Sequence, residues 1–290
     1  MASRRKRLER PAPQFSFGRL DRDAVVAVAR LGCCTATQLM GFLGWTYTQA
    51  NRHLLNAWAH GYLDKRTVTR SQLAEKADPQ NVYGSAPDIF VLEALGRKEA
   101  AALLADHEVS DTPEIHDKSF GVAHHLMLRD VRVWLEKVAR SYPSHPGLLD
   151  WRFERQAKVL NLIPDAWFRY GLPDREFGMF LEADRGTESL GKWEAKVAAY
   201  APLLAQEGEG SPVWQATGMA KARVMVVAPE PARRDYLWKV TERVAPLHGI
   251  RAGRFLFAEA HVLGFTDLAE PAWRADGMEG AVPLVKGELL

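Results

Sequence analysis

The sequence has very little cysteine and no long apolar run, and each absence narrows what the chain can be. Only two of its 290 residues are cysteine, the neighbours Cys33 and Cys34. Adjacent cysteines rarely bridge, because a disulfide needs two Cβ atoms that face each other. They are therefore expected to be small apolar residues of a reducing compartment. Without a long apolar stretch, neither a transmembrane helix nor a signal peptide is expected, which predicts a cytoplasmic protein with no membrane partner.

The chain also lacks a strong net charge. Its formal charge is +2, from 38 lysines and arginines against 36 aspartates and glutamates, which argues against a uniformly basic coat protein. The basic residues are nevertheless uneven, because five of them fall in the first ten positions: Arg4, Arg5, Lys6, Arg7 and Arg10. We expect residues 1–18 to form a flexible basic arm, which either follows DNA phosphates or is simply solvated.

Length and composition predict more than one soluble domain. The chain is 47% hydrophobic and 26% charged, and a length of this order corresponds to about two domains. After the arm, a first domain is expected over residues 19–106. A polar segment that contains Pro113 precedes a second domain over 119–262, and residues 263–290 form a C-terminal extension.

The first domain has the pattern of three helices followed by two strands. A helix that Asp21 caps runs to about Leu31, and two more cover about 35–43 and 46–60. Thr35 and Thr46 are each followed three residues later by glutamine, which is the pattern of a capping box. Strands are expected at 62–70 and 89–92, before a helix near 94–105. This order predicts a winged helix-turn-helix.

In such a domain the second helix of the motif enters the major groove of duplex DNA. The outward side chains of the helix over 46–60 would be Tyr47, Gln49, Asn51, Arg52 and His53. Asparagine and glutamine can pair with adenine, and arginine with guanine. Lys65, Arg66 and Arg70 on the first strand of the wing would contact phosphates. Alternatively, the domain serves protein contacts or dimerisation.

The second domain alternates helices and strands. A long helix over about 120–142 precedes three strands at 148–159, 162–170 and 177–183. A helix over 188–201, ended by Pro202, leads to an apolar, β-branched strand at 222–228 that is typical of a sheet centre. A helix at 232–246 and a strand at 254–258 follow. The order α-β-β-β-α-β-α-β predicts an α/β domain with a mixed central sheet, within an α+β chain.

Acidic residues occur where two of these strands meet. Asp165 falls early in one strand, and Glu182 and Asp184 end the next. Because alternate residues of a strand share a face, Glu182 and Asp184 should point the same way, with Asp165 beside them. Clustered carboxylates suit Mg²⁺ or Mn²⁺. Asp165 and Glu182 are the predicted metal ligands.

This arrangement resembles the PD-(D/E)xK nuclease fold over about residues 120–260. The lysine of that family would fall at position 184, where this chain has Asp184. In some members the lysine moves to the following helix, where Lys192 and Lys196 lie one turn apart. Lys196 is our candidate, and it completes the predicted catalytic set of Asp165, Glu182, Asp184 and Lys196. Alternatively, these acidic residues are turn or capping residues of an inactive nuclease fold.

Several segments together resemble the replication-relaxation family of bacterial mobile elements, over roughly residues 20–205. They are the helix-turn-helix, His124–Arg132, Trp151 with Glu154, Pro164–Ala166, and Phe180–Ser189 with Lys196 and Tyr200. The family includes MobC-type relaxases, which resemble metal-dependent nucleases. The resemblance implies binding and nicking of double-stranded DNA at a transfer or replication origin, alongside conjugation or replication proteins. It also implies that His125 and Glu154 support the metal site.

A second function remains open on the sequence alone. The chain could be a transcriptional regulator or replication accessory protein whose inactive nuclease-like domain mediates homodimerisation or protein docking. Aspartate in place of lysine at position 184 favours this function, whereas Asp165, Glu182 and Lys196 favour the nuclease. Tyr200 lies on the same side of its helix as Lys192, where it either attacks phosphate or forms a structural hydrogen bond.

Overall fold

The structure is a computed structural model, and it describes residues 9–68, 86–105, 109–110, 121–186, 188–251, 253–261, 268, 270–278 and 280–284. The chain divides into two units, Met1–Val133 and Trp134–Leu290. The dividing point lies inside helix α6, which runs without a break over Gly121–Ser141. Most of the polar segment over 107–118, where the sequence suggests a linker, lies outside the described residues.

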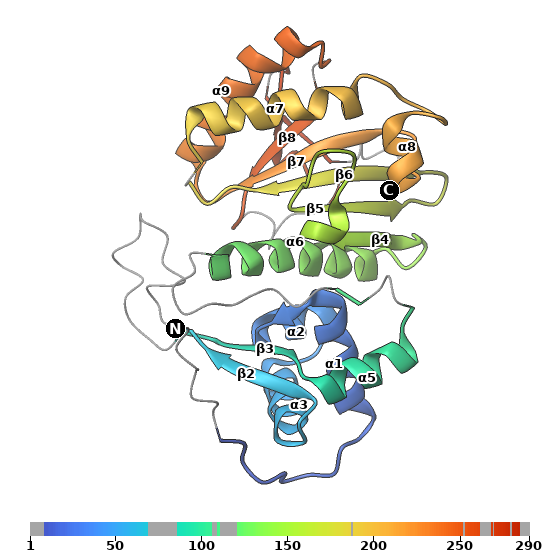
Figure 1. The fold of residues 1–290 in the computed structure, drawn as a ribbon, viewed down its shortest axis with the longest axis vertical. Coiled ribbons are helices and arrows are strands. Elements are labelled where there is room, and N and C mark those ends of the chain that lie inside the picture. Colours follow the sequence, from blue (N-terminus) through green and yellow to red (C-terminus); the bar gives the residue numbers. More distant parts are fainter. Residues whose placement is uncertain are drawn as a thin grey trace. The chain divides into compact units, whose positions relative to one another are not determined.

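The first unit contains most of the short elements that the sequence predicts (Figure 1). They are α1 (Arg19–Leu31), β1 (Cys33–Cys34), α2 (Ala36–Leu43), α3 (Tyr47–Ala59), β2 (Leu63–Thr67), β3 (Asp88–Leu92) and α5 (Ala94–Leu103). Capping boxes begin α2 at Thr35 and α3 at Thr46, as predicted. Gly44 ends α2 with φ +72°, a left-handed conformation that glycine adopts without steric cost.

Three strands of the first unit form an antiparallel sheet in the order β1-β3-β2. The sequence does not reveal β1, because two residues are too few to show a period; Cys33 and Cys34 are buried and pair with Val91 and Phe90 of β3. The helices pack into a core to which α3 contributes the side chains expected from its periodicity. Ala50, Leu54, Ala57 and Trp58 are all buried.

The second unit is organised around one large sheet. Beyond the C-terminal part of α6 its elements are β4 (Gly147–Phe153), the 3-10 helix η3 (Glu154–Ala157), β5 (Ala166–Gly171), β6 (Glu176–Ala183), α7 (Leu190–Leu204), α8 (Pro212–Thr217), β7 (Ala222–Ala228), α9 (Pro231–Val244), the 3-10 helix η4 (Ala245–His248), β8 (Phe255–Glu259), β9 (Trp273–Ala275) and β10 (Ala281–Val282). Their order follows the predicted alternation, except that the strand predicted over 148–159 ends at Phe153 and continues as η3, and that α8 lies between α7 and β7.

The seven strands are ordered β10-β9-β8-β7-β6-β5-β4. Strands β6, β7 and β8 are parallel to their neighbours in that group, and the other pairs are antiparallel, so the sheet is mixed as predicted. The apolar β7 lies at its centre. Helices α7 and α9 pack against each other and lie over the same face of the sheet (Figure 1).

One expectation about the second unit requires correction. Pro202 does not end α7, which continues to Leu204. A proline in the last turn costs one main-chain hydrogen bond, and the burial of Leu203 and Leu204 in the core offsets this loss. Within the predicted C-terminal extension, β9 and β10 extend the large sheet. No helix in the described part of the chain is long and apolar enough to cross a membrane.

Candidate functional site

The exposed face of α3 carries most of the side chains predicted to contact DNA. Tyr47 is 55% exposed, Gln49 and Arg52 are exposed, and Asn51 is half-buried. Gln49 also serves the capping box, since its Oε1 accepts the Thr46 N–H at 3.0 Å. The Gln49 amide oxygen therefore already has a hydrogen-bond partner at the start of the helix, whereas Asn51 and Arg52 lie on the face predicted to contact DNA.

The segment just before α1 lies against this face. The Phe15 carbonyl lies 2.8 Å from His60 Nε2, and the Phe17 ring stacks on Tyr62 with centroids 3.9 Å apart. The Arg52 guanidinium lies 4.4 Å from the centre of the Phe15 ring. The described part of the predicted arm, residues 9–18, thus contacts α3 and the residues that follow it. The basic residues 4–7 lie outside the described residues.

A groove of about 540 Å³ separates this segment from α3. Phe15 and Pro11 line one side of the groove, and Tyr47, Asn51 and Arg52 line the other. Aromatic rings beside an arginine and an asparagine provide stacking surfaces and hydrogen-bond donors, which are the groups that contact nucleobases.

His53 does not face outward as the helical spacing suggests. Its Nδ1 lies 2.8 Å from Asp21 Oδ1, and its side chain is only 14% exposed. Asp21 is the third residue of α1 rather than its cap, and its Oδ2 accepts the Gly18 N–H at 2.7 Å. The Asp21 carboxylate therefore holds α3 to the start of α1, which the sequence alone does not show.

The predicted basic residues of the wing have acidic neighbours. Lys65 Nζ lies 3.0 Å from Asp88 and 4.9 Å from the centre of the Trp58 ring, and Arg66 lies 3.3 Å from Asp64. These pairs reduce the positive charge that β2 offers to phosphates. Arg70 lies outside the described residues.

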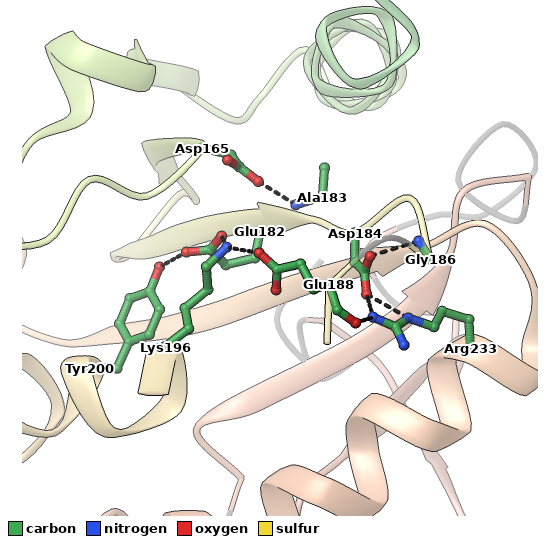
Figure 2. Close-up of polar contacts among 9 residues, drawn as sticks. All are labelled: Asp165, Glu182, Ala183, Asp184, Gly186, Glu188, Lys196, Tyr200 and Arg233. Carbon is green, nitrogen blue, oxygen red and sulfur yellow. Dashed lines mark hydrogen bonds and ion pairs between the residues drawn. The ribbon is translucent and has the colours of Figure 1, made fainter. Parts of the chain in front are cut away.

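In the second unit, the sheet brings Asp165 beside Glu182. Strands β5 and β6 are antiparallel, with Ala166 opposite Leu181, so the next pair along the ladder is Asp165 and Glu182. Directly opposed residues of an antiparallel pair project from the same face. The Asp165 main-chain oxygen accepts the Glu154 N–H at 2.8 Å, and its Oδ2 accepts the Ala183 N–H at 2.8 Å. The first contact fixes Asp165 to the end of β4, and the second, which Figure 2 shows, fixes it to the end of β6.

Helix α7 directs two side chains at Glu182. Lys196 Nζ donates to Glu182 Oε2 at 2.7 Å, and the Tyr200 hydroxyl donates to Glu182 Oε1 at 2.5 Å (Figure 2). The two residues are four apart, so they lie on one face of the helix. Lys192, one turn before Lys196, is exposed. Geometry therefore places Lys196, and not Lys192, beside the carboxylates.

Burial dominates the electrostatics of this cluster. Glu182 is 1% exposed, and burial together with the negative charge of Asp165 raises its pKa to about 8 against the lowering effect of Lys196 and Tyr200. Burial lowers the pKa of Lys196, but the surrounding carboxylates outweigh that effect and hold it above its ordinary value. Lys196 is therefore an ammonium at neutral pH, while Glu182 retains its proton over much of that range.

Asp184 points away from this cluster, contrary to the expectation that it shares a direction with Glu182. It follows the last residue of β6, and its Oδ1 accepts the Gly186 N–H at 2.7 Å. Its Oδ2 accepts from Arg233 Nε of α9 at 2.6 Å (Figure 2). The strand ends at Ala183, so strand alternation no longer applies at position 184. Arg233 is a neighbour that the sequence does not suggest, because 49 residues separate the pair.

Glu188 is a further acidic residue at the site, and the sequence alone does not single it out. Its Oε1 lies 2.9 Å from Lys196 Nζ, and its main-chain oxygen accepts from Arg233 at 2.7 Å. Its Oε2 is buried and has no hydrogen-bond partner among the described residues. A buried carboxylate oxygen without a donor is a ready acceptor for a cation or a water molecule. The segment just before α7 therefore adds a carboxylate to the site.

A divalent cation at this place would be bound mainly by solvent and substrate. In the described ranges no three His, Cys, Asp or Glu side chains are grouped so that they could hold a metal alone. Mg²⁺ commonly takes only one or two carboxylates and completes its shell with water and phosphate oxygens. Asp165 and Glu182 supply two carboxylates, and the unpartnered oxygen of Glu188 lies on the other side of Lys196.

Three further residues from the sequence analysis, Glu154, His125 and Tyr200, have different positions. Glu154 begins η3 directly after β4, with φ +47°, an uncommon conformation for a residue with a side chain. The hydrogen bond from its main-chain N–H to the Asp165 main-chain oxygen keeps Glu154 next to this predicted metal ligand. His125 belongs to α6 within the first unit. Tyr200 is fully buried, with its hydroxyl on Glu182, and so makes the structural hydrogen bond that the sequence leaves open.

One comparison with known proteins, that with family models, agrees with the resemblance in the sequence. The model of the replication-relaxation family matches residues 26–235, a span that includes α3 and the whole Asp165–Glu182–Lys196 cluster. No curated protein and no solved structure matched the chain. The family match covers well over half of the 290 residues. The chain therefore belongs to the replication-relaxation family, which connects it with the replication or relaxation of a plasmid or similar element and hence with DNA.

Proposed function

We propose that this protein binds specific double-stranded DNA through its first unit and nicks it with its second unit in a metal-dependent reaction, at a transfer or replication origin of a plasmid or integrative element. The single observation that carries the proposal is the convergence of Asp165, Glu182 and Lys196 at the edge where β5 and β6 meet. Two carboxylates and a lysine at one sheet edge match the requirements of phosphodiester hydrolysis.

The topology of the first unit supports the DNA-binding half of the proposal. The order α1-β1-α2-α3-β2-β3 with a three-stranded antiparallel sheet is the order that a winged helix-turn-helix would have. In this assignment α3 enters the major groove and presents Asn51 and Arg52 to base edges. Phe15 packs on the Arg52 guanidinium and limits the directions it can take, which favours one base over others.

Asp165 and Glu182 would hold Mg²⁺ or Mn²⁺, which when bound would activate water and stabilise the charge that develops on the phosphate. The residues of the chain have their own tasks. Lys196 places a permanent positive charge beside both carboxylates and can offset the charge of the phosphate. Tyr200 fixes the orientation of Glu182. A hydroxyl with no exposure cannot reach a DNA phosphate, so Tyr200 is assigned no nucleophilic role.

A second function is favoured by one specific observation. Asp184, which stands where the nuclease family has lysine, is held by Arg233 and Gly186 and faces away from Glu182. A regulator or replication accessory protein with an inactive nuclease-like unit, used for dimerisation, would have no need of a lysine there. This function predicts tight DNA binding without any cleavage.

A nicking assay separates the two functions. Duplexes selected by the full-length protein from a random library would be placed in a supercoiled plasmid, which is incubated with protein and Mn²⁺. The proposal expects open-circular product that depends on the metal and disappears with Glu182→Ala and Lys196→Ala. Lys192→Ala, one turn away on the exposed side of α7, is the matched control and should nick normally. If the wild type binds the selected duplex but does not nick the plasmid, the second function, that of a regulator or accessory protein, is supported instead.

A further inference from the structure

The turn between η3 and β5 has features that phosphodiester hydrolysis at Asp165 does not require. Val159 and Leu162 exchange two main-chain hydrogen bonds, of 2.9 and 3.0 Å, which close a tight turn at Leu160 and Asn161. Val159 is buried, and both it and Leu162 pack with the core cluster that contains Trp193 of α7. Residues 158–163, here named the apolar turn, are therefore fixed to the cluster that also supports the helix of Lys196.

The apolar turn presents large hydrophobic side chains to solvent. Leu160 and Ile163 are each 53% exposed. Leu160 also has φ +54°, in the left-handed region that strongly favours glycine or asparagine. Strained backbone of this kind persists where the surrounding structure enforces it, and it is concentrated at functional positions. The anchors at Val159 and Leu162 supply that constraint and hold the Leu160 side chain outward.

Charge and position indicate what such a tip would contact. Arg155 and Lys158, which precede the tip, are both exposed. Ile163 is two residues before Asp165, so the apolar tip leads directly into the carboxylate pair. Cations beside exposed apolar side chains form the combination with which proteins hold DNA phosphates and wedge between stacked bases.

We propose that the apolar turn binds DNA next to the nicked phosphate and unstacks a base step there. Arg155 and Lys158 contact phosphates on either side, while Leu160 and Ile163 enter the opened step. The proposal rests on the nuclease function proposed above, because that function places DNA at Asp165. It extends that function by making locally unpaired duplex the preferred substrate.

The test compares two probes in binding to the full-length protein: a fully paired duplex and the same duplex with a short central mismatch bubble. Unstacking a base step of paired duplex costs free energy, whereas the bases of the bubble are already unpaired. The wild type should therefore bind the bubble about tenfold more tightly. Leu160→Asn should abolish this preference. Asparagine tolerates the left-handed conformation, so the variant should melt at or above the wild-type temperature. Leu247→Asn, at a leucine that is 78% exposed on η4, is the matched control and should keep the preference.

The outcomes separate this inference from the proposed function. Equal affinity of the wild type for both probes would overturn the inference while leaving DNA binding intact, and would assign the apolar turn to a protein partner. A preference that survives Leu160→Asn in a folded protein would also overturn it. Binding to neither probe would overturn both the inference and the proposed function.

Discussion

Glu182→Gln should change how the stability of the second unit depends on pH. Glu182 has an ordinary pKa of 4.5, and burial with the nearby charge of Asp165 raises it to about 8 in the folded chain. Below pH 4.5 the folded and unfolded chains both hold the proton. Between pH 4.5 and pH 8 the folded chain keeps a proton that the unfolded chain releases, so the free energy of unfolding falls as the pH rises. Above pH 8 the full cost of the buried charge is present.

The size of the effect follows from the two pKa values. Each pH unit corresponds to about 1.4 kcal/mol, so the interval from 4.5 to about 8 is worth about 5 kcal/mol. Glutamine keeps the shape of the protonated acid but cannot ionise. The variant should therefore gain about 5 kcal/mol relative to the wild type between the two ends of this interval. Over this interval Lys196 of the wild type stays an ammonium, because its pKa lies above the ordinary value.

Urea unfolding, monitored by tryptophan fluorescence, measures this difference, because seven of the nine tryptophans lie in residues 134–290. Glu194→Gln provides the control, since Glu194 pairs with Arg243 on the exposed side of α7 and its loss should leave the pH dependence unchanged. If wild type and Glu182→Gln give parallel stability curves across this interval, then Glu182 ionises as it would in water, and the buried cluster described here is wrong.

Three further predictions concern DNA and metal binding. Arg52→Ala should weaken binding to a selected duplex by about 1–3 kcal/mol and relax the choice of one base pair; an equal loss on all sequences, measured by competition, would make Arg52 a phosphate contact. Phe15→Leu should lower the discrimination at the same base pair about two- to fivefold, because the guanidinium loses the ring that supports it. Phe15→Tyr keeps a ring and should keep the discrimination. The affinity for Mn²⁺, measured by calorimetry, should rise about tenfold per pH unit up to about pH 8, because Glu182 must lose its proton to bind a cation. An affinity that does not change with pH would exclude Glu182 as a ligand.

Local sequence determined most of the elements of this fold. Thr35 and Thr46 each have a glutamine three residues later, so two helices begin where the pattern indicates. The run Ala222–Ala228 has no polar face, and it therefore lies at the centre of the sheet. These features depend on neighbours within one turn or one strand, and sequence spacing reports such neighbours directly.

The sequence also determined which residues were candidates for the site, but tertiary structure decided how they are used. Strand alternation correctly suggested that Asp165 and Glu182 meet, because the two strands are consecutive and antiparallel. It failed at Asp184, which lies one residue past the end of β6 and pairs with Arg233 of a distant helix. Helical spacing put Lys192 and Lys196 on one face, with Lys196 as the candidate, and the packing of α7 on the sheet directs Lys196 at Glu182.

Contacts between distant residues elsewhere in the chain are equally hidden from the sequence. Nothing in the sequence shows that Phe15 packs on Arg52, that His53 turns inward to Asp21, or that Leu160 is held in a strained turn. Hydrophobic period and charge fix which elements form, because they depend on the chain over a few residues. Contacts between residues far apart in the chain, and the burial that raises the pKa of Glu182, exist only once those elements pack.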